Sequence, residues 1–307
     1  MTTLYISHPD CQLHEMGPGH PESPLRLRAI ESRLETSELE PRLVRVTAPV
    51  VDPAWLHQTH GRRYVEEIEA LHPGHGLSWA DPDTALNPHS LSAAHRAAGA
   101  VVEAARQVLD ARADNAFCAI RPPGHHAEQE RAMGFCLFNN VAVGVDWALK
   151  QGGAERVAVL DFDVHHGNGT VDIFQDRPEV LVCSSFQFPF YPFRYQDIRR
   201  PNIVHTPLPG GTGSDAFRLA IERDWLPALR DHRPDIVFIS AGFDAHRADP
   251  LAQLLLEDED YRWITDLIVD AARRDTGGRI VSVLEGGYDL PALARSVEQH
   301  LAGLLDS

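Results

Sequence analysis

Two carboxylates and two imidazoles stand within six consecutive residues, in the stretch DFDVHHG at 161–167. The stretch directly follows the apolar run VAVL, so its charges begin where a buried strand is expected to end. Charged side chains in such a place are costly unless something pairs with them. In an extended segment alternate side chains share a face, which groups Asp161, Asp163 and His165. Carboxylate and imidazole at this spacing suit a divalent metal such as Zn2+, so the pattern predicts part of a metal site.

A catalytic zinc site keeps about three protein ligands and one open position. Asp163 and His165 supply two, and Asp244 in the segment SAGFDAH is the best candidate for the third. The alternative for Asp244 is a helix N-cap or an Asx turn, a common role for Asp after a strand. The same ligand types accept Fe2+ or Co2+, so the sequence does not identify the metal.

The adjacent histidines His125 and His126, in the segment RPPGHH, are interpreted as proton-transfer groups because imidazole titrates near neutral pH. Such histidines need orienting partners, and Asp161 and Asn168 are the polar residues near the metal ligands in sequence. An Asp partner favours an imidazolium far more than an Asn does. We therefore hypothesise that the two histidines are held in different protonation states.

Tyr288 follows two glycines in the segment LEGGYD. A phenol on a Gly-Gly turn can turn toward a carbonyl oxygen at the metal and donate a hydrogen bond to it. The alternative for Tyr288 is a half-buried surface tyrosine.

The elements that must position these residues alternate along the chain. Apolar, β-branched runs predict strands at 117–120, 156–162, 180–186, 235–241 and 279–285. Helix-like stretches lie between them at 91–113, 139–152, 214–232 and 259–275. This alternation is typical of an α/β fold with a mostly parallel sheet covered on both faces, in which ligands bind at the carboxyl ends of the strands. Four of the five predicted strands are followed by the His-, Asp- or Tyr-containing segments described above.

Composition limits the class of protein. The formal net charge of −16 disfavours nucleic-acid binding, and no apolar run approaches membrane-spanning length. The N-terminus resembles no signal peptide, and the four cysteines are scattered without a CxxC pair. These features favour a cytoplasmic protein without a membrane partner; they do not fix the oligomeric state.

With these residues in hand, the chain resembles the zinc-dependent histone deacetylase family, which includes bacterial histone deacetylase-like amidohydrolases and acetylpolyamine amidohydrolases. The resemblance rests on the ordered segments RPPGHHA, GFCLFNN, DFDVHHGNG, SAGFDAH and LEGGYD. It implies one deacetylase domain over 1–307 with the arginase–deacetylase fold, an eight-stranded parallel sheet sandwiched between helices. The implied activity is hydrolysis of an acylated lysine side chain or a related acylated amine.

The resemblance also implies a role for each site residue. Asp163, His165 and Asp244 bind Zn2+, His126 is the general base and then the general acid, and His125 assists electrostatically with Asp161 behind it. Asn168 matches the class II pattern, and Tyr288 polarises the amide carbonyl. Gly134, Phe135 and Tyr191 form the acyl-lysine tunnel, where Tyr191 replaces the usual Phe and adds a hydroxyl. A structural K+ site is implied at Asp161, Asp163, His165 and Ser184.

The substrate is the least defined expectation. Polyamine-selective relatives place a Glu after a DP pair, where this chain has Leu251, and this favours acyl-lysine or another acylated amide. Asp83 is a candidate for holding the substrate backbone, with a turn residue as the alternative. An acetylpolyamine amidohydrolase and an inactive acyl-binding homologue remain as alternatives. An arginase-like two-metal hydrolase is disfavoured because His125 and His126 replace the second set of ligands.

Overall fold

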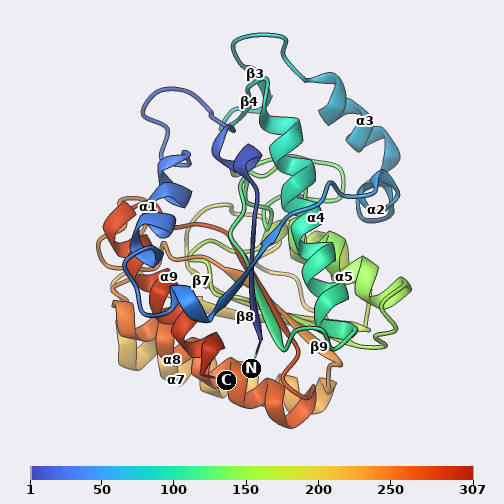
Figure 1. The fold of residues 1–307 in the computed structure, drawn as a ribbon. Coiled ribbons are helices and arrows are strands. Elements are labelled where there is room, and N and C mark those ends of the chain that lie inside the picture. The colour runs from blue at the N-terminus through green and yellow to red at the C-terminus, as the bar shows by residue number, and fades with distance from the viewer. Residues whose placement is uncertain (1, 307) are drawn as a thin grey trace.

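The computed structural model describes residues 2–306, and its centre is a parallel β-sheet (Figure 1). Within this part of the chain the sheet has eight strands in the order β2-β1-β5-β10-β9-β6-β7-β8, and all neighbours run parallel. The strands are β1 (Thr3–Ser7), β2 (Leu43–Thr47), β5 (Asn115–Cys118), β6 (Val157–Asp161), β7 (Val180–Gln187), β8 (Ile203–Leu208), β9 (Ile236–Ala241) and β10 (Ile280–Leu284). The predicted α/β fold with an eight-stranded parallel sheet is confirmed.

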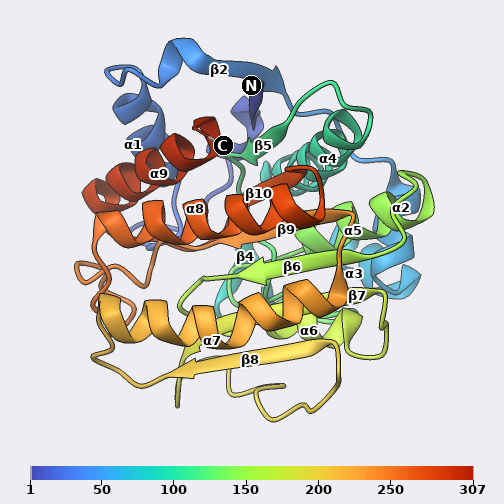
Figure 2. The same cartoon turned by 90° about the horizontal axis from the view of Figure 1, so that it is seen from below.

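Helices cover both faces of the sheet (Figure 2). One layer contains α1 (Leu25–Leu34), α7 (Ser214–His232), α8 (Asp258–Asp275) and α9 (Leu290–Leu305). The other contains α4 (Ser90–Leu109), α5 (Asn140–Lys150) and α6 (Asn168–Phe174), with α2 (Pro53–Thr59) and α3 (Arg62–Ala70) beside them. Every residue of β6, β7, β9 and β10 is buried, which explains their continuous apolar sequences.

Side-chain caps start the helices that follow the site segments. The Asn139 side chain accepts a hydrogen bond from the amide of Ala142 at the start of α5, and Asp289 does the same for Ala292 at the start of α9. These caps satisfy amide groups that have no partner within the helix. They fix the points at which the loops after β5 and β10 end.

Short elements lie outside the main layers. Two 3-10 helices, Pro9–Gln12 and Glu40–Arg42, lie in the N-terminal part of the chain. Strands β3 (Ser78–Asp81) and β4 (Thr84–Leu86) form a separate antiparallel hairpin, at the top of Figure 1. The sequence prediction contained neither this hairpin nor β1, β2 and β8.

The strand order explains how four separate segments form one site. Strands β5, β10, β9 and β6 are consecutive neighbours in the sheet. Because they run parallel, the segments RPPGHH, LEGGYD, SAGFDAH and DVHHGNG leave the same edge side by side. Residues that are far apart in sequence therefore meet at this edge. The amide of Gly124, for example, donates a hydrogen bond to the carboxylate of Glu285, 161 positions away.

In the described part of the chain no helix is long and apolar enough to cross a lipid bilayer. The cysteines at 11, 118, 136 and 183 are all buried, and none of them forms a disulfide.

A close backbone contact on α4 gives a test of the packing. A Cβ atom added to Gly99 would lie 2.1 Å from the carbonyl oxygen of Pro49 and 2.8 Å from the amide nitrogen of Val51. Alanine normally stabilises a helix relative to glycine, but here it must push this backbone aside. We expect Gly99→Ala to lower the free energy of unfolding by about 1–3 kcal/mol in urea denaturation. Gly74→Ala, where nothing lies within 4 Å of the new atom, is the control and should be near neutral. An unchanged stability for Gly99→Ala would contradict this packing.

Candidate active site

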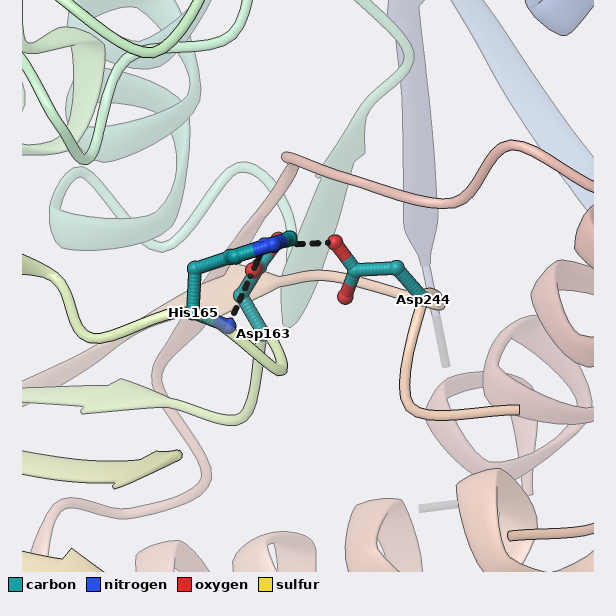
Figure 3. Close-up of side chains that lie close together, drawn as sticks. All are labelled: Asp163, His165 and Asp244. Atoms are coloured by element: carbon teal, nitrogen blue, oxygen red, sulfur yellow. Dashed lines mark hydrogen bonds and ion pairs between the residues drawn. The ribbon is translucent and has the colours of Figure 1, made fainter. Parts of the chain in front are cut away.

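Three predicted ligands converge at the carboxyl ends of β6 and β9 (Figure 3). Nδ1 of His165 lies 3.1 Å from Oδ1 of Asp163 and 3.1 Å from Oδ2 of Asp244. One ligand atom from each residue falls within 4.8 Å of the other two. Two carboxylate oxygens and one imidazole nitrogen form a donor set that fits a divalent ion such as Zn2+.

Backbone amide groups hold these carboxylates in place. Gly286 donates its N–H to Oδ2 of Asp163 at 2.8 Å, and Val164 donates to Oδ1 of Asp244 at 2.9 Å. Asp244 caps no helix, because the next helix, α8, begins at Asp258. Its two oxygens instead face Val164 and His165, and this geometry supports the ligand interpretation over the cap.

The charges within this group are unbalanced. Burial disfavours the imidazolium form of His165, but hydrogen bonds to Asp163 and Asp244 outweigh this and raise its pKa to about 10. Burial and the neighbouring Asp163 raise the pKa of Asp244. A nearby positive charge would stabilise both carboxylates, and a protonated His165 or a divalent cation would supply one.

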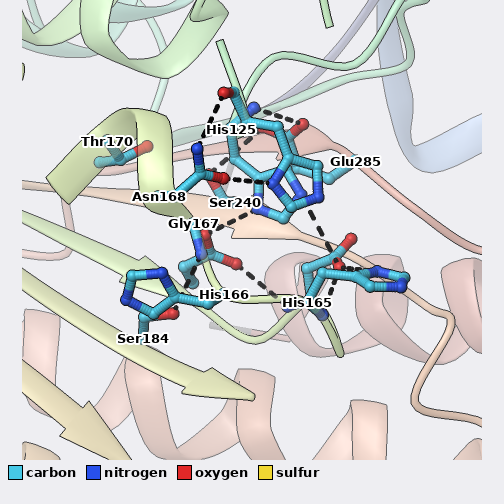
Figure 4. A network of polar contacts seen from close by, with 12 residues as sticks. His125, His165, His166, Gly167, Asn168, Thr170, Ser184, Ser240 and Glu285 are labelled. Atoms are coloured by element: carbon cyan, nitrogen blue, oxygen red, sulfur yellow. Dashed lines mark hydrogen bonds and ion pairs between the residues drawn. The ribbon is translucent and has the colours of Figure 1, made fainter. Parts of the chain in front are cut away.

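The tandem histidines have the two different partners that the sequence suggested, and Figure 4 labels one member of each pair, His125 and Asn168. Nδ1 of His125 donates to Oδ2 of Asp161 at 2.9 Å, and Nδ1 of His126 donates to Oδ1 of Asn168 at 2.7 Å. The centres of the two rings are 4.0 Å apart. In its neutral form His126 therefore keeps Nε2 as the unprotonated ring nitrogen.

The environment moves the pKa values of these two histidines in opposite directions. For His125, burial lowers the pKa, but the carboxylates of Asp163 and Asp161 outweigh burial and raise it well above the ordinary value. For His126, burial and the positive charges of His125 and His165 hold the pKa well below the ordinary value. This difference agrees with the hypothesis of one charged and one neutral imidazole.

Glu285 is a buried site residue that the sequence analysis missed. Its Oε2 accepts hydrogen bonds from the amides of Gly124 at 2.7 Å and His125 at 3.1 Å, and Oε1 accepts one from Ser240 Oγ at 3.3 Å. Burial raises its pKa to about 7. Its position directly after β10, in LEGGYD, was the available signal. Glu285 fixes the turn that carries the two histidines.

A cavity of about 200 Å³ opens above these groups. It is lined by Asp83, Pro123, His125, His126, Gly134, Phe135, His165, Phe190, Tyr191, Leu251, Gly286 and Tyr288. Every predicted tunnel residue is among them. The predicted catalytic groups His125, His126 and Tyr288 therefore share one cavity with His165, a predicted metal ligand.

Aromatic rings form the walls of this cavity. Phe135 meets Tyr288 edge to face with centres 6.0 Å apart, and Tyr191 meets His126 in the same way at 5.3 Å. Phe190, which the sequence analysis did not name, stacks on His165 at 5.5 Å. The run FYP at 190–192 contained this signal, but an isolated sequence does not show that both rings face the cavity.

A close contact with His126 requires glycine at position 134. Its φ is +58°, and a Cβ atom there would lie 2.4 Å from Cδ2 of His126. The glycine thus lets the wall that carries Phe135 lie directly against His126.

Asp83 joins the two walls. Its Oδ1 accepts a hydrogen bond from the Gly134 amide at 3.0 Å, and its Oδ2 accepts one from the Tyr191 hydroxyl at 3.3 Å. The Tyr191 hydroxyl, which the usual Phe lacks, therefore forms its hydrogen bond within the protein. The predicted role of Asp83 as a holder of the substrate backbone is untested by these contacts.

Two of the residues predicted to bind K+ accept hydrogen bonds from backbone amides of the loop after β6. Ser184 Oγ accepts a hydrogen bond from the Gly167 amide at 3.4 Å, and Oδ1 of Asp161 accepts one from the Asp163 amide at 3.1 Å. Potassium binding stays a prediction.

Comparisons with known proteins find similar proteins over most of the chain. The model of the histone deacetylase domain matches residues 20–304. A histone deacetylase-like amidohydrolase from Pseudomonas aeruginosa is 40% identical over 296 residues, covering 93% of this chain and 78% of that protein. A probable deacetylase from Methanothermobacter thermautotrophicus is 39% identical over 310 residues, covering 98% of this chain and 90% of that protein.

A solved structure is also similar. The crystal structure of the HDA15 HD domain superposes with a TM-score of 0.93 and 34% identity, covering all of this chain and 88% of that one. A family match over most of the chain, together with these relatives, shows that the chain belongs to the histone deacetylase family.

Proposed function

We propose that this protein is a metal-dependent amidohydrolase that removes the acyl group from acylated lysine side chains or related acylated amines. The observation that carries the proposal is the single cavity containing His126, Tyr288 and the ligand His165. Asp163, His165 and Asp244 would hold one Zn2+, or Fe2+ with the same ligand types. When bound, the metal supplies Lewis-acid polarisation of the acyl carbonyl and lowers the pKa of water.

The side chains then divide the proton transfers between them. His126 takes a proton at Nε2 from the attacking water, because its Nδ1 proton is held by Asn168. The same proton passes from Nε2 to the amine nitrogen as the carbon–nitrogen bond breaks. The Tyr288 hydroxyl donates a hydrogen bond to the acyl oxygen as negative charge develops there. His125, charged through Asp161, stabilises that negative charge. The products are a carboxylate and a free amine.

The lining of the cavity supports an acyl-lysine substrate. Aromatic rings surround a narrow space that suits an alkyl chain, and Leu251, an apolar residue, lies at the position where polyamine-selective relatives carry Glu. An acetylpolyamine amidohydrolase is the second candidate, and an inactive acyl-binding protein is the non-enzymatic alternative. We further propose that residues 1–307 form one deacetylase domain, that K+ binds near Ser184, and that the protein is cytoplasmic.

The first prediction concerns activity. The purified zinc-loaded protein should release acetate from an acetyl-lysine peptide faster than from a monoacetylated diamine. Tyr288→Phe removes only the hydroxyl that donates to the developing oxyanion, so kcat should fall about 10²–10³-fold with little change in KM. Tight zinc binding without cleavage of either substrate would favour the acyl-binding alternative. Faster cleavage of the diamine would favour the polyamine alternative.

The second prediction concerns the metal. Asp244→Asn keeps the shape of the side chain but removes a buried charged ligand, so zinc affinity should fall by more than about 100-fold. Metal content after dialysis, measured by mass spectrometry, should drop from about one ion per chain to a small fraction. Asp235→Asn is the matched control, because Asp235 directly precedes β9 at the opposite end of that strand. Equal zinc content in the wild type and Asp244→Asn would refute the ligand assignment.

The third prediction concerns pH. The environment lowers the pKa of His126, so this base is neutral at pH 7 and is lost only when it becomes protonated in acid. Asn168→Asp places a carboxylate at Nδ1, where Asn168 Oδ1 now lies 2.7 Å away, and raises that pKa. The acidic limb of kcat/KM should therefore move to higher pH by roughly 1–3 units. A limb that stays in place would argue against His126 as the base, and a wild-type profile with one ionisation would argue against two differently charged histidines.

A further inference from the structure

Asp249 is a buried carboxylate to which the proposed mechanism assigns no role. It lies in the loop after β9 and is only 6% exposed. Its Oδ1 accepts a hydrogen bond from the Leu251 amide at 2.9 Å. Its Oδ2 accepts hydrogen bonds from the amides of Tyr288 at 2.7 Å and Asp289 at 3.3 Å. One side chain therefore joins the loop after β9 to the loop after β10.

The bonds to Tyr288 and Asp289 are more than a local turn requires. An Asx turn would be complete with the bond from Leu251 to Oδ1 alone. The bond from the Tyr288 amide spans 39 positions of sequence. Among the described residues Asp249 forms no ion pair, and its hydrogen-bond donors are these backbone amides. Three backbone N–H donors meet at the Asp249 side chain, and a carboxylate can accept from all of them. An amide side chain would turn its own NH2 group toward one of these donors, so the contacts favour a carboxylate.

The direction of the Tyr288 phenol is set by its backbone together with ring contacts to Phe135 and Arg26. Within residues 2–306 its hydroxyl forms no hydrogen bond with the protein, and its side chain lines the cavity. The two preceding residues are glycines, and Gly287 has a φ of +120°. The glycines are held at their own positions: Gly286 donates to Asp163, and Arg26 donates to the Gly287 carbonyl at 2.7 Å. The Tyr288 amide itself is held by Asp249.

We propose that Asp249 is a positioning residue that fixes the Tyr288 backbone, so that the phenol donates its hydrogen bond to the acyl oxygen in the correct direction. This inference rests on the proposed function. Misplacing a catalytic group by about 1 Å can cost about 100-fold in rate. Asp249 would therefore act on kcat through Tyr288, without touching the substrate.

A double-mutant cycle with Tyr288→Phe tests the proposal. Asp249→Ala should lower kcat about 100-fold and Asp249→Asn, which keeps one acceptor oxygen, about 10-fold, with KM nearly unchanged. In the Tyr288→Phe background Asp249→Ala should lower kcat by less than about 2-fold, because the hydroxyl that it positions is already gone. Zinc content should equal that of the wild type in all variants.

Hydrogen exchange supplies a readout that does not depend on activity. In metal-free protein the amides of Tyr288 and Asp289 should exchange faster in Asp249→Ala than in the wild type. Asp235→Ala is the matched control: one of its oxygens also accepts from two consecutive amides, those of Glu155 at 2.8 Å and Arg156 at 2.9 Å. It should leave kcat and exchange near Tyr288 unchanged.

The outcomes separate this inference from the proposed function. If the wild type cleaves neither substrate, the proposed function fails, and unchanged exchange in Asp249→Ala would overturn the backbone contact as well. If the wild type is active but Asp249→Ala lowers kcat by the same factor with and without the Tyr288 hydroxyl, Asp249 has only a general structural role and the inference is wrong.

Discussion

The concentration of buried carboxylates at one edge of the sheet is the constraint on which the rest of the structure depends. Asp161, Asp163, Asp244 and Glu285 are at most 1% exposed, and each follows or ends one of the strands β6, β9 and β10. Ionised carboxylates in such an environment cost several kcal/mol each unless partners repay it, and like charges raise one another's pKa. Every one of these groups therefore accepts hydrogen bonds from amides, hydroxyls or imidazoles of a neighbouring loop.

This requirement accounts for the form of the loops. The glycines at 124 and 286 bring amide N–H groups against Glu285 and Asp163, and a side chain there would collide with atoms less than 3 Å away. Glycine is needed at both positions because its small size lets these amides approach the carboxylates, and not only because it is flexible. The imidazoles of His125 and His165 supply the positive charge that amides lack. A divalent cation at the three predicted ligands would complete the same balance, and the proposed activity would then depend on the charges that also shape this edge.

A second buried group of charges holds the site from the N-terminal side. Glu22 receives hydrogen bonds from Arg121 and forms an ion pair with Arg26 at 3.2 Å, and all three side chains are fully buried. Burial raises the pKa of Glu22, but the two arginines outweigh it and bring the pKa to about 2. Arg26 also donates to the carbonyls of Glu285 and Gly287. The segment HPESPLR is therefore a support for the loop that carries Tyr288.

The sequence predicted those features that depend on residues close to one another along the chain. Strands such as β6 and β9 are continuous apolar runs, and their polar ends marked the site. Strand β2 is half exposed and β8 contains Pro207, so neither has that pattern. Glu285, Phe190 and Asp249 were missed because their roles arise from contacts between loops that are distant in sequence. A single sequence contains no record of which loops become neighbours in the sheet.

The cavity walls depend on a different part of the fold from the catalytic groups. Asp83 lies in the turn of the β3–β4 hairpin and Thr84 is the first residue of β4. They accept hydrogen bonds from the amides of Gly134 and Phe135, and Asp83 also accepts one from the Tyr191 hydroxyl. The hairpin is separate from the main sheet, whereas the predicted metal ligands and the tandem histidines follow central strands of that sheet. The walls are nevertheless tied to the sheet, because Gly134 and Tyr191 both lie against His126 and Phe135 lies against Tyr288. The shape of the cavity therefore depends on the hairpin and on the loops after the central strands together.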